Sequence, residues 1–420
     1  MSESIRKSLL QFIFSGAYLL RWNDKLRPVE MTEIDKQAHK MLIACVLWHL
    51  HCQHSPKTDA TALARDIIEG GLSDYFYRIV ITDIKPPVFY RIRENADDYA
   101  KLTDFVLAQL ETCFVPSENP SENSFWQRLC AWQRNPEENT LARRILNASH
   151  LFASQWEFSL IRPFNAFDDE MDDIAKSFSE SLEPYSDLDG MTALRTPGTA
   201  LARFANLCGQ LRFQIRWTRL PRIPKTAVLG HMFLVAAFSY FFSLSINACQ
   251  SRCNNNFFSG LFHDLPEVLT RDIISPVKRS VPNMPSIIKK YESDSLERRL
   301  FEQLREENCH SLVDLISFYL GIPIGSEFSE CYRGQDGVVH SISDFDTLHT
   351  YYNSDEYTPK DGILIKVCDW LAAFLETENS IRTGVSSPQL VEARFKLKSL
   401  LHDKNVPPCL KLDTLLADFD

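Results

Sequence analysis

The sequence predicts a predominantly α-helical protein of two domains, and three observations support this prediction. The chain has 420 residues, which is two to three times the usual size of a single domain. Only 14 residues are glycine, which is few for the turns of a β-sandwich or a Rossmann sheet. Most segments place apolar residues at helical spacing instead. Hydrophobic residues make up 45% of the chain, which is enough for sizeable cores.

The domain boundaries follow from local composition. An acidic, polar stretch from Asp168 to Thr196 separates two helix-rich segments, and such a stretch is typical of a linker. We therefore expect a helical domain over residues 1–165, an acidic linker over 166–205 and a second helical domain over 206–420. A run rich in Gly, Ser, Asp and Tyr at 321–362 predicts an inserted loop or small hairpin inside the second domain.

The two helix-rich segments also resemble each other, which indicates a duplicated helical domain. Each segment has an Arg-Trp pair, then an apolar helix that a histidine opens, then a stretch that aligns without gaps and has six identical residues in eighteen. The matching pairs are Arg21-Trp22 with Arg216-Trp217, His39 with His231, residues 71–88 with 260–277, and His150 with Asp369.

Charge and cysteine usage limit the partners and the compartment. The formal net charge of −10 disfavours binding to a nucleic acid polymer or an anionic membrane surface, but it leaves room for a small anionic ligand. No apolar run approaches the roughly 20 residues that cross a bilayer, so we expect no membrane partner. The eleven cysteines are odd in number and include no CxxC pair, which favours a reducing cytoplasm over a disulfide framework.

The second segment contains four potential metal ligands, namely His231, His263, Asp264 and Asp369. Two imidazoles and two carboxylates suit a divalent transition metal such as Mn²⁺, Co²⁺, Fe²⁺ or Zn²⁺. All four residues lie in otherwise apolar helical sequence, where unpaired polar groups would be costly to bury. We therefore expect three helices to place them around one ion in the core of a bundle.

Residues near these four positions suit catalysis and substrate binding. Glu267 lies one helical turn after Asp264, and Asp272 follows shortly. A carboxylate beside a metal-bound water is what general acid/base hydrolysis requires. Upstream, Arg216 offers a planar fork for a phosphate group, and Trp217 offers a flat face for a sugar or a base.

The order His231, His263-Asp264, Asp369 resembles the HD-domain superfamily of metal-dependent phosphohydrolases. Residues 263–278, with Arg216-Trp217 fifteen residues before His231, are similar to its bacterial 5′-deoxynucleotidase branch. The resemblance implies a helical fold, usually homodimeric, which uses one divalent ion (Co, Mn, Fe, Zn or Mg) to remove phosphate from deoxynucleoside 5′-monophosphates. The insertion at 321–362 departs from the compact pattern of that branch.

The resemblance also implies a role for each candidate residue. Metal binding would fall to the four ligands above, and acid/base catalysis to Glu267 and Asp272. Arg216 would contact the phosphate, and Trp217 would line the sugar site and help to exclude a 2′-hydroxyl group.

The same alignment predicts that the first domain is catalytically inactive. Asp74, Tyr75, Arg78 and His150 stand where the second domain has His263, Asp264, Glu267 and Asp369. We therefore expect a degenerate HD-like domain that packs on the second as a pseudo-dimer, in a monomer or a further homodimer. Two alternatives stay open. One is hydrolysis of deoxynucleoside triphosphates, and the other is a nucleotide sensor with little turnover that binds through Arg21 and Trp22.

A further group of potential ligands comprises His49, His51, Cys52 and His54. At this spacing the side chains fan around a helix end, whereas a closed zinc site needs four converging ligands. We interpret this group as a solvated helix terminus.

Overall fold

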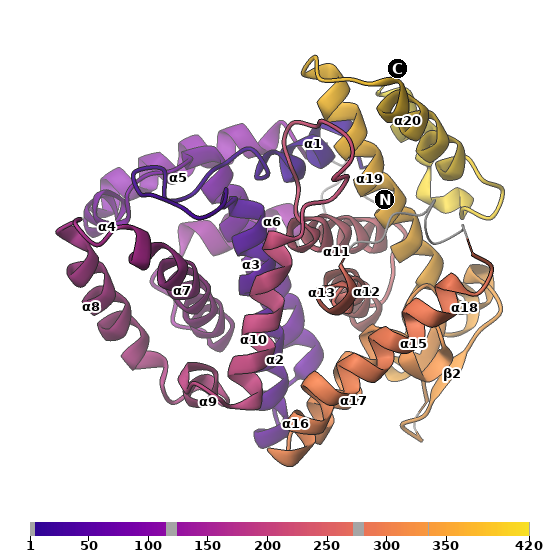
Figure 1. Cartoon of the computed structure of the whole chain (residues 1–420), viewed down its shortest axis with the longest axis horizontal. Helices are drawn as coiled ribbons and strands as arrows, with labels where there is room; N and C mark the ends of the chain where they lie inside the picture. Colours follow the sequence, from indigo (N-terminus) through magenta and orange to yellow (C-terminus); the bar gives the residue numbers. More distant parts are fainter. Residues whose placement is uncertain (1–4, 115–123, 272–280, 335, 420) are drawn as a thin grey trace.

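The structure, a computed structural model, describes residues 5–114, 124–271, 281–334 and 336–419 (Figure 1). Within these ranges the protein is all-α apart from one two-stranded hairpin, which confirms the predicted fold class. The hairpin pairs β1 (Cys331–Arg333) with β2 (Val339–Ser341) in antiparallel register, inside the insertion expected at 321–362.

The helices of the N-terminal half are α1 (Lys7–Ser15), α2 (Glu33–His54), α3 (Ala60–Ile81), α4 (Pro86–Glu94), α5 (Ala96–Glu111), α6 (Phe125–Arg134) and α7 (Leu141–Ile161). Next come α8 (Glu170–Leu182), α9 (Met191–Arg195) and α10 (Ala200–Gln210). The C-terminal half contains α11 (Val228–Ser245), α12 (Gln250–Phe262), α13 (Glu267–Thr270), α15 (Met284–Leu296), α16 (Glu302–Glu306), α17 (His310–Tyr319), α18 (Phe345–Tyr351), α19 (Gly362–Arg382), α20 (Pro388–Leu401) and α21 (Leu412–Ala417). Short 3₁₀ turns lie at Arg162–Phe164, Glu183–Tyr185, Leu211–Phe213, Ile322–Ile324, Asp355–Tyr357 and Pro408–Leu410, and a π-helical turn at Glu297–Phe301.

Local sequence explains where the main helices begin. Thr32, Asp59, Thr140 and Ser387 each accept a hydrogen bond from a backbone N–H in the first turn of α2, α3, α7 and α20, respectively. These side chains satisfy donors that have no partner within the helix, and such caps stabilise a helix by about 1 kcal/mol each.

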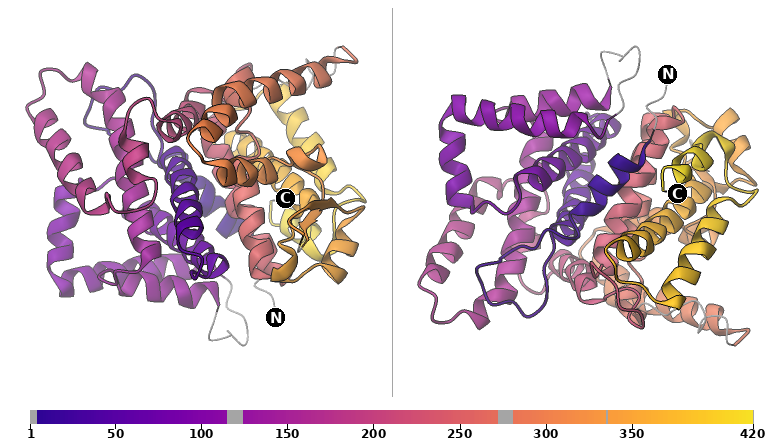
Figure 2. Two further views of the ribbon diagram at one scale, coloured as in Figure 1. Left: turned by 90° about the horizontal axis from the view of Figure 1, so that it is seen from below. Right: turned by 90° about the horizontal axis from the view of Figure 1, so that it is seen from above.

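One continuous hydrophobic core runs through both halves. The two halves lie side by side, and α2 packs on α11 while α3 packs on α12 between them (Figure 2). Helix α11 is apolar on all sides. By length and composition it could cross a membrane, contrary to the expectation that no apolar run approaches that length, but 89% of it is buried inside the protein. Its apolar composition is therefore explained by its position in the core of the protein.

The range 166–205, which we expected to be an acidic linker, is largely helical and contains α8, α9 and the start of α10. Its apolar side chains, including Leu182, Met191 and Leu201, belong to the shared core. Helix α10 also packs on α2. This range therefore contributes to the packing that holds α2 in place.

The loops before α2 and α11 have the same backbone pattern. A single antiparallel bridge closes each loop, between Leu20 and Thr32 in the first half and between Ile215 and Ala227 in the second. Trp22 and Trp217 both have a positive φ, 56° and 59°, which is rare for a bulky side chain. The two loops therefore share a backbone conformation that is unusual for tryptophan.

Candidate metal centre

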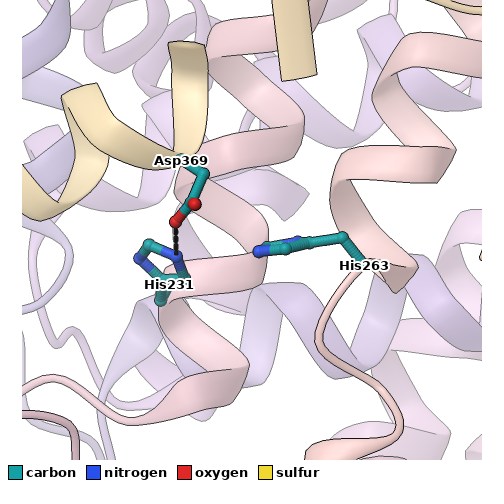
Figure 3. Close-up of side chains that lie close together, drawn as sticks. All are labelled: His231, His263 and Asp369. Carbon is teal, nitrogen blue, oxygen red and sulfur yellow. Dashed lines mark hydrogen bonds and ion pairs between the residues drawn. The ribbon is translucent and has the colours of Figure 1, made fainter. Parts of the chain in front are cut away.

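Three of the four expected ligands converge in the C-terminal half. One nitrogen each of His231 and His263 and one oxygen of Asp369 lie within 4.8 Å of one another (Figure 3). His231 Nε2 lies 3.1 Å from Asp369 Oδ1. Among the described residues this is the one group of three or more potential ligands at such spacing. Both imidazoles are buried, whereas the Asp369 side chain is 19% exposed, so solvent reaches the group from one side.

Helix packing explains why these side chains meet. His231 lies in the first turn of α11, His263 caps the end of α12, and Asp369 lies in α19. Helices α11 and α12 approach closely at Gly260, because a Cβ there would lie 2.9 Å from the backbone N and Cα of Ala236. Only glycine permits this approach, and it sets the position of His263 one turn later.

The hydrogen bond of His263 fits a metal ligand. Its Nδ1 lies 2.7 Å from the carbonyl oxygen of Gly260, which can only accept, so Nδ1 carries the proton. Its Nε2 is then the atom that would face an ion, and it is buried beside Asp264, whose Oδ2 lies 3.1 Å away. Metal-bound histidines commonly donate their other N–H to a backbone carbonyl in this way.

Asp264 lies beside this group rather than within it. Its Oδ2 is 3.1 Å from His263 Nε2, 4.0 Å from His231 Nε2 and 3.7 Å from a terminal nitrogen of Arg216. Burial favours the neutral acid, but the nearby His263 and His231 outweigh it and hold the pKa of Asp264 well below its usual range. In return, burial lowers the pKa of His263, while Asp264 and Asp369 raise it by more, to about 9. The carboxylates are thus ionised, as metal ligands must be.

Arg216 and Trp217 are both held by Glu376, a residue that the sequence analysis missed. Trp217 Nε1 donates to Glu376 Oε2 at 2.7 Å, and Arg216 Nε donates to the same oxygen at 3.3 Å. Thr226 donates to the other carboxylate oxygen. Burial opposes ionisation of Glu376, but Arg216 and Arg222 outweigh it and lower its pKa to about 2. Glu376 lies two helical turns after Asp369 in α19, on the same face.

Of the two expected acid/base residues, only Glu267 lies among the residues that the structure describes. Glu267 opens the short helix α13, one turn after Asp264, and its backbone N–H donates to the Asp264 carbonyl. Its own carbonyl accepts from Gln214, which precedes the Arg216 loop. Asp272 lies outside the described residues.

Comparison with known proteins identifies this part of the chain. Residues 208–398 match the model of the HD domain family, and the match spans all four expected ligands. These residues are therefore similar to HD domains, and we call them the HD domain below. No curated protein and no solved structure gave a significant match. HD domains bind divalent metals and are in general metal-dependent phosphohydrolases, and the His231–His263–Asp369 group is a possible site for such an ion.

The insertion contributes a wall to the HD domain site. Phe328 lies in the loop before β1, and its ring is 6.3 Å from that of His263. The Nζ of Lys366 lies 4.0 Å from the centre of the Phe328 ring and 3.1 Å from Asp369 Oδ2. Sequence reasoning missed both residues. Lys366 precedes Asp369 by one helical turn, and this spacing predicts that the two side chains are neighbours. The position of Phe328 depends on the fold of the loop, which no local pattern indicates.

The N-terminal half differs from the HD domain at each ligand position. We expected His39 to match His231, and this pairing is wrong. The loop hydrogen bonds Arg21 N to Met31 O and Arg216 N to Thr226 O align the two helices, so that Lys36 matches His231. His39 lies one turn further on, where its Nε2 contacts the carbonyl of Ala205. His39 therefore faces α10.

The group at His49, His51, Cys52 and His54 does not converge. His51 and His54 each contact Asp189, at 3.2 Å and 2.9 Å, while His49 contacts Ser311. Among the described residues, no set of three ligand atoms in this group lies close enough for an ion. These histidines therefore make polar contacts at the end of α2.

Proposed function

We propose that the HD domain removes phosphate from nucleoside 5′-monophosphates and prefers the deoxy forms. The observation that carries this proposal is that the Arg216-Trp217 pair lies next to the candidate metal ligands. A terminal nitrogen of Arg216 is 3.7 Å from Asp264, and Glu376 fixes the guanidinium and the indole together. A phosphate-binding fork and an aromatic wall beside a metal site suit a phosphomonoester on a sugar.

The residues present fit a divalent ion, because two imidazole nitrogens and two ionised carboxylates form a typical borderline donor set. His231, His263, Asp264 and Asp369 would hold the ion. When bound, a divalent ion supplies a water molecule that is acidic enough to attack phosphorus at neutral pH. The four groups come from α11, α12 with the turn after it, and α19, so the bundle itself presents them.

The other side chains would orient the substrate and move protons. Arg216 would neutralise the phosphate oxygens with a planar pair of donors. Trp217 would close the sugar site, so that a 2′-hydroxyl group meets the indole and is excluded. Glu267 is the candidate for the general acid/base, because its carboxylate follows Asp264 by one turn. Glu376 is a positioning residue for Arg216 and Trp217.

Phosphate release from ribo- and deoxynucleoside mono- and triphosphates tests the proposal, with Mn²⁺, Co²⁺, Mg²⁺ or EDTA present. We expect metal-dependent release from the monophosphates, with the deoxy forms hydrolysed at least tenfold faster. Asp264→Ala should abolish release. Asp187→Ala is the matched control. This exposed aspartate lies in the N-terminal half, outside the HD domain, and pairs with Arg144.

Inorganic triphosphate as the product would replace this proposal with triphosphohydrolase activity. Tight nucleotide binding without any product would replace it with the sensor. Equal activity of Asp264→Ala and the native protein would show that the reaction occurs elsewhere.

We also propose that the N-terminal half is a degenerate HD-like repeat, so that the monomer is a pseudo-dimer. The support lies in matched contacts. Trp22 Nε1 and Arg21 Nε donate to Glu157, as Trp217 and Arg216 donate to Glu376. The ligand positions carry Lys36, Asp74, Tyr75 and His150, a set that cannot rebuild the metal site.

A further inference from the structure

Basic side chains gather in the N-terminal half at the positions where the HD domain has its candidate ligands. Lys36, which matches His231, donates from Nζ to His150 Nδ1 at 2.5 Å, and His150 matches Asp369. One turn further along α2, Lys40 Nζ lies 2.7 Å from Asp74 Oδ2, and Asp74 matches His263. Two ammonium groups therefore lie in the N-terminal half at the place that corresponds to the candidate metal site of the HD domain.

Lys36 is the cation of this cluster that lies farthest from a carboxylate. Glu33 lies 3.7 Å from Lys36, but 2.7 Å from Arg21 and 3.6 Å from Arg78. Arg78 also pairs with Asp83 at 2.6 Å. Glu157 is occupied by Arg21 and Arg212, and Asp74 by Lys40. Lys36 has no closer carboxylate among the described residues, and its burial lowers its pKa to about 7 despite Glu33. An anion would give Lys36 a closer counter-charge.

Solvent reaches the edge of the cluster. Lys36 and Lys40 are buried, but His150 is exposed, and the side chains of Asp74 and Arg78 are 33% and 22% exposed. A small ligand that approaches His150 therefore meets the two ammonium groups behind it.

The loop of the N-terminal half also retains its strained form. Trp22 keeps a positive φ of 56°, although no metal ligand remains beside it, and Glu157 still fixes Arg21 and Trp22. Backbone strain of this kind costs about 1–3 kcal/mol and is commonly found at ligand sites. The retained loop presents an indole next to the basic cluster.

We propose that this cluster binds the phosphate group of a phosphomonoester directly, without a metal ion, through Lys36, Lys40 and Arg78. Trp22 lies where it would contact the sugar or base of a nucleotide. The N-terminal half is then a binding site rather than a second catalytic site. This inference rests on the duplication proposed above, and it is independent of catalysis by the HD domain.

Calorimetric titration of the full chain in EDTA tests the inference, with inorganic phosphate, dAMP and deoxyadenosine as probes. We expect dAMP to bind at least tenfold more tightly than phosphate, and deoxyadenosine not to bind. Lys36→Met removes one charge at similar volume and should weaken dAMP binding at least tenfold. Because Lys36 is buried with a shared counter-charge, this variant should unfold at the native temperature or above.

A variant in the other half separates the two sites. Arg216→Ala removes the phosphate fork of the HD domain, and the dAMP binding that this variant retains in EDTA should still be weakened by Lys36→Met. Binding that is lost in Arg216→Ala and kept in Lys36→Met would overturn the inference, as would absence of binding in EDTA. If Lys36→Met unfolds, Arg78→Met at a partly exposed position replaces it and should weaken binding severalfold. Inactivity of the HD domain would leave this titration unaffected.

Discussion

Trp217 and Glu376 are joined by a 2.7 Å hydrogen bond from the indole nitrogen to a carboxylate oxygen that is fully buried. They lie far apart in the sequence, and the bond ties the loop before α11 to the helix that carries Asp369. The same oxygen accepts from Arg216. One buried carboxylate thus orients both residues that are proposed to contact the substrate.

Replacing this carboxylate should weaken substrate binding more than catalysis. We expect Glu376→Gln to raise KM for deoxynucleoside monophosphates about tenfold, with a smaller change in kcat, because Arg216 and Trp217 lose a shared acceptor. Loss of a charged hydrogen-bond acceptor should also cost about 2 kcal/mol of stability. Glu378→Gln is the matched control, since Glu378 is equally buried in α19 but pairs with Arg382 and Arg394. An unchanged KM in Glu376→Gln would refute the positioning role.

Metal binding should be visible in stability alone. At an ion concentration of 100 times Kd, a ligand that binds only the folded state adds about 2.7 kcal/mol. We expect Mn²⁺ or Co²⁺ to raise the unfolding temperature of the native protein and EDTA to reverse this. His263→Ala should lose the effect, whereas the exposed His402→Ala should keep it. A metal-dependent shift that survives in His263→Ala would place the ion elsewhere.

Glu330 should make the protein less stable as the pH rises. It is only 7% exposed, and its burial raises its pKa to about 7, although Ile363 N donates to it. Between its unfolded pKa of roughly 4.5 and about 7, the unfolded chain releases a proton that the folded protein keeps, so stability falls across this window by about 3 kcal/mol. Urea unfolding of the native protein and Glu330→Gln at pH 4.5 and 7.5 measures the difference, and parallel curves would contradict it.

The insertion should affect substrate binding through Phe328. Phe328→Ala removes the ring that lies against His263 and Lys366, and we expect KM for monophosphates to rise three- to tenfold. Phe328→Leu should retain most of the native value, because it restores apolar volume. Metal affinity, followed by the metal-dependent shift in unfolding temperature, should not change. An identical KM in all three proteins would show that the insertion does not face the substrate.

The HD domain should not fold without the N-terminal half. Helix α11 is buried on all sides and packs on α2, so residues 166–420 alone would expose a large apolar surface. We expect this fragment to aggregate, and its solubility and circular dichroism are the measurements. A soluble and fully active fragment would contradict the pseudo-dimer.

The fold class and most of the candidate site could be predicted from the sequence, because helical spacing and ligand chemistry are local signals. His231, His263 and Asp369 stood out as polar residues in apolar helices, and the structure brings them together. The hairpin within 321–362 was likewise indicated by local composition. The contact of Phe328 with His263 depends on long-range packing, which no local pattern specifies.

Sequence spacing indicates both the correct partner of His231 and the role of Glu376. Lys36 follows Arg21 by the same fifteen residues that separate Arg216 from His231, and this spacing would have corrected the pairing with His39. Glu157 and Glu376 each stand seven residues after His150 and Asp369, so comparison of the two segments would have found Glu376. Spacing from the Arg-Trp pair is therefore a better guide to the matching residues than shared residue type.

Gly230 lies at a close contact between the two halves, where even one added carbon would clash. A Cβ there would lie 2.8 Å from Asp35 Oδ1 and 2.9 Å from Ile34, so α2 and α11 touch directly at this residue. Asp35 precedes Lys36, and Gly230 precedes His231. A ligand that displaced Lys36 would therefore press on the helix turn that carries His231. Thermodynamic linkage makes such an effect reciprocal, so occupancy of either half would alter affinity in the other by the same factor.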